Sequence, residues 1–258
     1  MIRKTILLLS SLLLAPLCLI SAQNVVAPSI QQFNVKPDNT PDVNRDNLQR
    51  AIDWAAERGA ALYVEPVEGG YPVAAGVVLK QNVSLVGAHG PTGRGTKDPK
   101  ADRPIGSLFI ITDSSAPFLT VESSTQVRGI QFWYPEQSHT DPDKIIAYPP
   151  TIQMSQHKSV QGVTLSSLTF YGEYMAMDFN GRGDNICEQI LFEHCYGYPL
   201  SGEFIRIDFC YDTRVCCIVT LILPICDFSG AHSHERLLIR LLLVVHILIP
   251  STIPITPR

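Results

Sequence analysis

The segment Asp42–Gly90 constrains the fold most, because one amphipathic helix is followed directly by short strands separated by glycine turns. Between Asn44 and Gly59 the apolar residues recur at spacings of three and four, which predicts a helix over about 45–58 with one apolar face. Asn44 is the expected N-cap, and Gly59 is the expected stop after the last turn. The apolar face consists of Leu48, Ala51, Ile52 and Ala55.

Short apolar runs follow the helix, and the same kind of run continues through the middle of the chain. The first four runs are Ala61–Val64, Tyr71–Val73, Val77–Leu79 and Val83–Gly87. Later runs end in phenylalanine at Phe132, Phe170 and Phe192, which lie 38 and 22 residues apart. This spacing suits coils of about 20–25 residues with one long loop inserted.

Many short strands without intervening helices can form a sandwich, a barrel or a parallel β-helix. The repeat favours the β-helix, in which each coil buries its inward residues against the next. The first coil of such a solenoid has an open apolar end, and a single helix before the first strand can cover it.

The start of the chain resembles the opening of the pectate lyase superfamily, in its rhamnogalacturonase and epimerase-like branch. The residues that carry the resemblance are Leu48–Asp53 through Gly59, then Ala61–Val64, and finally Asn82–Gly87. The resemblance covers roughly residues 35–212. It implies an all-β fold, a right-handed parallel β-helix of the pectin lyase type with an N-terminal capping α-helix. The sequence departs from the family where Gly-Asp-Gly usually precedes the helix, because Lys36–Asp42 stands there instead.

The N-terminus has the pattern of a secretory signal peptide over residues 1–22. Arg3 and Lys4 precede an apolar run that ends at Ile20, and the small residues Ser21 and Ala22 follow. The run is shorter than the roughly 20 apolar residues of a spanning helix, so we expect export to the periplasm or the cell exterior rather than anchoring. The β-helix domain would then occupy residues 23–212.

Charge and cysteine usage exclude several classes of partner. The chain has 20 basic and 24 acidic residues, and loss of Arg3 and Lys4 with the signal leaves 18 against 24, a net charge of −6. Such a protein lacks the basic surface that nucleic acid requires. The seven cysteines crowd late in the chain, and we interpret them as buried apolar residues rather than as a disulfide framework. Their spacing is not that of zinc ligands, so no metal site is expected.

A long basic insertion after Gly90 supplies the first candidate carbohydrate-binding residues, Arg94 and Lys97. On an acidic protein this loop could meet an anionic sugar such as a uronate. The alternative is a solvated loop without a ligand. The Gly-Lys-Ser/Thr order of a phosphate-binding loop is absent, so nucleotide binding is not expected.

A second insertion, between Trp133 and Pro150, is rich in aromatic residues and proline. Trp133, Tyr134 and Tyr148 offer flat platforms for sugar rings, and projecting loops are where solenoids carry function. The alternative is that these side chains only cover the side of the β-helix.

Cleavage of glycosidic bonds requires either two carboxylates a few ångströms apart for hydrolysis, or a base, often with a bound cation, for elimination from a uronate. Candidates fall in successive coils, and outward-facing ones on a single face could cluster. They are Glu173, Asp178, Asp184, Glu188, Glu193, His194, Arg206 and Asp208. The sequence does not show which of them share a face. The paired-aspartate and Gly-His-Gly signatures of polygalacturonase hydrolases are absent, so the catalytic residues stay unassigned.

The composition changes after Asp212. From Arg214 to Arg258, 20 of 45 residues are Leu, Ile or Val, and the strand-and-turn pattern ends. The run Leu237–Ile249 has 13 residues and includes Arg240, so no stable membrane span is expected. We interpret residues 213–258 as an atypical apolar tail, the product of a shifted reading frame or a truncated gene.

The resemblance implies an exported protein that acts on pectin-like or other acidic polysaccharide by lyase or glycoside hydrolase chemistry. Whether the chain is an enzyme stays open, because no catalytic set is identifiable. A non-catalytic extracellular carbohydrate-binding β-helix and an inactive fragment are the alternatives. No cofactor is identified, and Ca²⁺ would be expected only for lyase chemistry.

Overall fold

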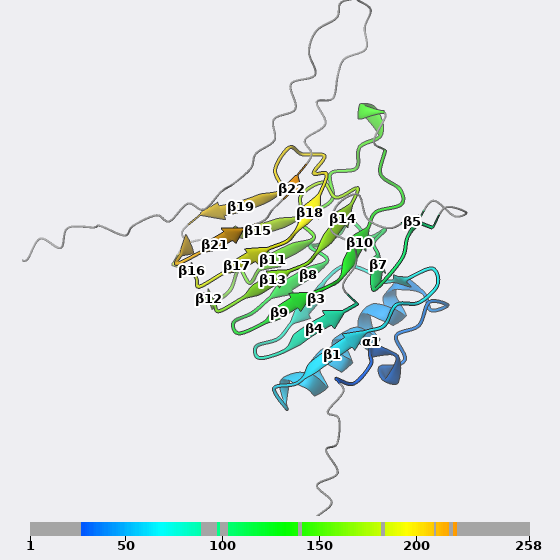
Figure 1. Ribbon diagram of the computed structural model, residues 1–258, viewed down its shortest axis with the longest axis horizontal. Helices are drawn as coiled ribbons and strands as arrows, with labels where there is room; N and C mark the ends of the chain where they lie inside the picture. The colour runs from blue at the N-terminus through cyan, green and yellow to red at the C-terminus, as the bar shows by residue number, and fades with distance from the viewer. Residues whose placement is uncertain are drawn as a thin grey trace, which may run out of the picture.

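The chain is a right-handed parallel β-helix with one α-helix at its N-terminal end, as predicted (Figure 1). The computed structural model describes residues 27–88, 97–98, 103–138, 141–181, 184–208, 210–216 and 219–220. The predicted signal peptide, residues 1–22, and the tail from residue 221 onward lie outside the described residues. The helices are η1 (Ile30–Phe33), α1 (Pro41–Ala56) and η2 (Pro142–Lys144).

Three long sheets form the sides of the β-helix. The first sheet contains β1 (Ala61–Val64), β4 (Ser84–Gly87), β9 (Gln126–Arg128), β13 (Thr164–Ser166), β17 (Leu191–Glu193) and β21 (Arg214–Cys216). The second contains β2 (Tyr71–Pro72), β7 (Leu108–Ile110), β10 (Gln131–Trp133), β14 (Thr169–Tyr171), β18 (Tyr196–Gly197) and β22 (Val219–Thr220). The third contains β3 (Val77–Leu79), β8 (Leu119–Val121), β11 (Ile152–Met154), β15 (Met177–Asn180) and β19 (Ile205–Asp208).

Two smaller sheets complete the described strands. The fourth sheet consists of β12 (Val160–Gln161), β16 (Cys187–Glu188) and β20 (Cys210–Tyr211), which pair in parallel. The short strands β5 (Lys97–Asp98) and β6 (Arg103–Pro104) form an antiparallel pair within the first insertion. Every other described strand pair is parallel, so each strand lies beside its counterpart in the next coil (Figure 1).

Single residues with left-handed backbone conformation turn the chain at the corners. One of them lies two residues before each of β4, β9, β13, β17 and β21, and φ at these positions is between 49° and 68°. They are Asn82, Ser124, Gly162, Gln189 and Asp212. A backbone hydrogen bond links each of the first four corners to the next coil, as from the Ser124 amide to the Gln161 carbonyl at 2.7 Å. Asn and Gly adopt this conformation readily, whereas Ser and Gln do so at some energetic cost.

Apolar side chains point inward from the described coils and stack in ladders along the axis. In the second sheet this ladder is aromatic, and Phe109 pairs with Phe132, which pairs with Phe170. The rings of Phe132 and Phe170 are stacked with centroids 5.1 Å apart. Because parallel strands in register place like positions side by side, one aromatic residue per coil builds a continuous core.

The helix α1 covers the end of the first coil, as predicted (Figure 1). Its residues Leu48, Ala51, Ile52 and Ala55 are fully buried against β1, β2 and β3. The outer edge of β1 is partly paired as well, since the Tyr63 amide donates to the Pro28 carbonyl at 2.9 Å. The apolar and unpaired ends of the first coil are therefore both protected.

The helix begins at Pro41, earlier than the sequence pattern indicated, and the prediction of Asn44 as N-cap is wrong. Thr40 is the N-cap, and Pro41 suits the first helical position because its φ is already helical. Asn44 is instead buried within the first turn, where its amide group donates to the Lys36 and Pro72 carbonyls. The prediction for the other end is confirmed, since Gly59 has a φ of 58° and the Ala60 amide bonds the Ala55 carbonyl.

The phenylalanine repeat was partly misread. Phe132 and Phe170 are direct partners in the second sheet, but Phe192 lies in the first sheet opposite Leu165. The spacing of 22 residues therefore does not measure one coil. It separates Phe170 on the second sheet from Phe192 on the first, and both side chains are buried in the core. The described ladders also continue past Asp212, because β21 pairs with β17 and β22 pairs with β18.

Truncation of the aromatic ladder tests this description. Phe132→Ala removes a fully buried ring that contacts Phe109, Phe118 and Phe170, and we expect the free energy of unfolding to fall by about 3–5 kcal/mol. The matched control is Val43→Ala on α1, where the side chain is 47% exposed and the change should stay within roughly 0.5 kcal/mol. Urea unfolding followed by circular dichroism measures the free energy of unfolding of both variants. If both lose the same amount, the aromatic ladder is not a main source of stability.

Candidate functional site

The outer surface of the third sheet brings together residues from five coils. Strand register aligns Val78, Thr120, Gln153, Asp178 and Arg206 in one row along the axis. The neighbours of the first four residues on either side are buried, so alternation along these strands places the row outside, and Arg206 continues it by its register with Asp178. The row becomes charged only at its last two described members.

Asp178 and Arg206 form the centre of the candidate site. Asp178 is only 3% exposed although it occupies an outward position. Its Oδ1 accepts a hydrogen bond from the Asn180 amide at 3.0 Å, and its Oδ2 lies 3.7 Å from Arg206 Nη1. The carboxylate is thus fixed by its own strand and faces a guanidinium from the next coil.

Glu203 contacts the same guanidinium from the other side. Arg206 Nε donates to Glu203 Oε2 at 3.1 Å, and Nη2 contacts the same oxygen. This hydrogen bond is the main reason that the pKa of Arg206 is raised, so the guanidinium stays charged throughout the accessible pH range. Both side chains are about half exposed, Arg206 at 43% and Glu203 at 51%, and an exposed ion pair contributes only about 0–1 kcal/mol. A soluble anion can therefore displace Glu203 at little cost.

A third carboxyl group, that of Glu173, lies inside the protein at the corner between β14 and β15. It is 0% exposed, and neither carboxyl oxygen has a partner in full hydrogen-bond geometry. Burial raises the pKa of Glu173 to about 8, while the backbone amides of Glu173 and Tyr198 oppose this rise more weakly. Glu173 is therefore neutral at pH 7.

Gly197 makes room for that carboxyl group. A Cβ atom at this position would collide with Glu173 Oε1 and with the ring of Phe204. Gly197 of β18 stands beside Phe170, at the position where the next side chain of the aromatic ladder would lie. The ring of Phe204 takes that place and packs edge-on against Phe170, with centroids 5.6 Å apart. The last described coils thus combine a glycine, a buried acid and an aromatic ring in the space of one core residue.

Two of the predicted aromatic platforms are buried. Tyr134 and Tyr148 pack edge to face with centroids 4.8 Å apart, and Tyr134 shares a hydrogen bond with Thr151 at 2.6 Å. Burial raises the pKa of both phenols, that of Tyr148 to about 12. Their packing matches the alternative that they cover the side of the β-helix. Trp133 is half-buried and lies on the outer side of the second sheet, beside Ile110 and Tyr171.

The basic insertion contributes little to the described structure. Arg94 lies outside the described residues, and Lys97 is described only as part of the backbone of β5. Neither residue can be placed at the Arg206 site, so their role in binding stays a prediction.

The remaining acidic candidates are spread over several sheets. Glu188 belongs to the fourth sheet and Glu193 to the first, whereas Asp178, Arg206 and the backbone of Asp208 belong to the third. His194 is a corner residue with a φ of 50°, whose amide bonds the Cys216 carbonyl. Glu203, which completes the contacts of Arg206, was missed by the sequence analysis. Its only signal was the spacing of three residues to an arginine.

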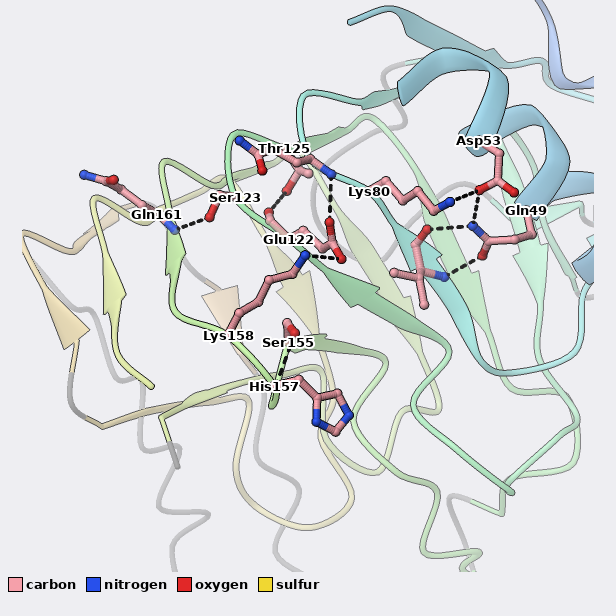
Figure 2. A network of polar contacts seen from close by, with 12 residues as sticks. Gln49, Asp53, Lys80, Glu122, Ser123, Thr125, Ser155, His157, Lys158 and Gln161 are labelled. Carbon is pink, nitrogen blue, oxygen red and sulfur yellow. Dashed lines mark hydrogen bonds and ion pairs between the residues drawn. The ribbon is translucent and has the colours of Figure 1, made fainter. Parts of the chain in front are cut away.

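A separate polar network follows the corner between the third sheet and the first (Figure 2). Lys80 pairs with Asp53 of α1 at 2.8 Å, and Lys158 pairs with Glu122 at 2.6 Å. Glu122 also accepts a hydrogen bond from the Gln81 amide, so it links three successive coils. These groups satisfy one another, and we interpret the network as a connection between the cap and the coils rather than as a binding site.

Other types of site are not found within the described part of the chain. No group of three or more His, Cys, Asp or Glu side chains there is arranged to hold a metal ion. None of the helices described has the length and apolar character of a membrane span.

No protein-family model matches the sequence, and no curated protein is significantly similar to it. Among solved structures, a candidate glycosyl hydrolase from Parabacteroides merdae aligns with a TM-score of 0.39 and 12% identity, over 74% of this chain and 96% of that one. The A-module of a mannuronan C-5 epimerase from Azotobacter vinelandii aligns with a TM-score of 0.38 and 14% identity, over 75% of this chain and 57% of that one. Similarity this low carries no argument about activity, and the fold rests on the strand ladders themselves.

The buried Glu173 predicts a specific pH dependence of stability. The folded state keeps its proton up to a pKa of about 8, while the unfolded state loses it near 4.5. Between these values the folded state binds more protons, so the stability contributed by this group falls as the pH rises through that window and is constant outside it. We expect Glu173→Gln to remove this loss, which is on the order of 4 kcal/mol.

Urea unfolding at about pH 5 and about pH 9 measures the difference between Glu173→Gln and the unaltered protein. The control, Glu57→Gln, removes an exposed carboxylate on the cap and should leave the difference between the two pH values as it is. A Glu173→Gln protein with the same pH dependence as the unaltered protein would show that the buried acid is ionised in the fold.

Proposed function

We propose that this protein is an exported, polysaccharide-active β-helix that binds an acidic polysaccharide on the outer surface of its third sheet, with Arg206 as the residue that binds a sugar carboxylate. The observation that carries the proposal is the arrangement of Asp178, Arg206 and Glu203. Asp178 holds the guanidinium from the protein side, and Glu203 occupies the exposed side where a uronate carboxylate can replace it. An arginine oriented in this way suits a planar carboxylate, because its N–H groups match two oxygens at once.

The rest of the row supports an extended ligand. Successive coils are about 4.8 Å apart, so a chain lying along the axis would pass the nearly buried Asp178 after leaving Arg206, and then Gln153 and Thr120. Gln153 and Thr120 are half-buried and offer amide and hydroxyl groups, which can bond sugar hydroxyls. The row therefore provides one exposed charged residue, Arg206, and two neutral polar residues beyond the nearly buried Asp178.

Of the two reactions that the sequence suggested, this arrangement favours elimination over hydrolysis. Hydrolysis requires two carboxyl groups that face the scissile bond from opposite sides, whereas Asp178 and Glu203 both contact the one guanidinium of Arg206. Elimination requires a cation on the uronate carboxylate and a base for the proton on the adjacent carbon. Arg206 would supply the charge, and the displaced Glu203 would take that proton as the double bond forms. The glycosidic oxygen would leave with the electron pair of its bond and take a proton from water. Arg206 takes the role of the cation in this scheme, and a chelator tests whether Ca²⁺ also takes part.

Binding and turnover of defined polysaccharides test the proposal. We expect the purified protein to bind polygalacturonate or alginate in affinity electrophoresis and not a neutral polysaccharide such as dextran. Arg206→Gln should weaken that binding by about tenfold or more, the usual effect of losing a charged hydrogen bond. Lys144→Gln is the matched control, because it removes an exposed cation on η2 that pairs only with Asp141 among the described residues.

Product analysis separates the functional alternatives. Release of unsaturated sugars that persists with a chelator supports elimination, and new reducing ends without unsaturation indicate hydrolysis. Binding without either product leaves a carbohydrate-binding protein. Equal binding of acidic and neutral chains, or no effect of Arg206→Gln, would contradict the proposed role of Arg206.

A further inference from the structure

Two cysteines stand on neighbouring coils at directly paired positions. Cys187 of β16 is the register partner of Cys210 of β20 in the fourth sheet. Paired residues of adjacent strands have Cα atoms about 4.8 Å apart, within the roughly 4.4–6.8 Å range that a disulfide spans. Val160 holds the equivalent position in the coil before and is buried, so this row of residues points into the core.

The two thiols differ in exposure and in chemical character. Cys187 is fully buried, and its Sγ lies 3.4 Å from the Phe179 carbonyl oxygen. Cys210 is half-buried and also contacts Thr213. The interaction between the two side chains lowers the pKa of Cys210 and raises the pKa of Cys187. Cys210 is therefore the thiol that is both more accessible and more readily ionised.

We propose that Cys187 and Cys210 are a disulfide-forming pair that joins two consecutive coils near the C-terminal end of the described β-helix. Neither cysteine forms a disulfide in this structure. Strand pairing already places them opposite each other, so closing the bond needs only a side-chain adjustment. The proposal is independent of the polysaccharide site, which lies on the third sheet.

The oxidant is a low-molecular-weight disulfide such as oxidised glutathione. The Cys210 thiolate attacks one sulfur of that disulfide and releases one thiolate, which leaves a mixed disulfide on Cys210. Cys187 then loses its proton and attacks Cys210 Sγ, and the second thiolate leaves. Two protein thiols are thereby oxidised to one disulfide, and one small disulfide is reduced to two thiols.

The bond would stabilise the C-terminal end of the described β-helix, where β20 pairs with a described strand on one side only. Among the described strands, β20 is the last of the fourth sheet, so one of its edges has no further described strand beside it. A disulfide from residue 187 to residue 210 closes a short loop and restricts the unfolded chain. For a chain of this size we expect a melting temperature higher by roughly 5–10 °C in the oxidised protein.

The test compares the full-length protein in reduced glutathione with the protein in oxidised glutathione. Peptide mapping by mass spectrometry without reduction should reveal a cross-linked pair of peptides that contain Cys187 and Cys210. Thiol titration should show the loss of two thiols, and the melting temperature should rise with the oxidant. Cys210→Ser should abolish the cross-linked peptide and the rise, and it should leave Cys187 unmodified because the buried thiol is not attacked directly.

The control is Cys195→Ala, which removes another buried thiol and should leave the cross-link intact. A Cys210 that stops at the mixed disulfide would overturn the proposal, as would a cross-link that joins other cysteines such as Cys195 and Cys216. Because the mapping is made on the unaltered protein, the result does not depend on whether a variant folds.

Discussion

The register between parallel strands of successive coils determines nearly every other feature of this protein. A parallel ladder places each residue beside its equivalent in the next coil, about 4.8 Å away. An apolar inward position therefore adds to a continuous core, as Phe109, Phe132 and Phe170 do. The same rule leaves the first coil with an apolar end, and α1 covers it with Leu48, Ile52 and their neighbours.

The charged and reactive groups follow from the same register. Asp178 and Arg206 are not close in sequence, but paired positions on β15 and β19 bring the carboxylate and the guanidinium together. Cys187 and Cys210 meet in the same way on β16 and β20. One pair faces outward and is available to a ligand, whereas the other faces the core and can form a bond within the protein.

The last described coils depart from the regular packing of the earlier ones. Gly197 replaces the large residue that continues the aromatic ladder in the preceding coils, and the neutral carboxyl group of Glu173 and the ring of Phe204 use that space. A buried acid lowers stability when it ionises, so the stability of this region depends on pH. The proposed disulfide lies in the same two coils and would compensate for part of that weakness.

The sequence by itself determined the architecture and the covering helix. Leu48 to Ala55 repeat with helical period, Gly59 ends the helix, and short apolar runs without further helices require a stack of strands. It did not determine which residues meet. Phe192 looked equivalent to Phe132 but belongs to another sheet, Tyr134 and Tyr148 looked like open platforms but are buried, and Asn44 looked like a cap but holds two backbone carbonyls. Only the tertiary structure decided these points, because loops of unequal length change the distance in sequence between positions that strand pairing brings together.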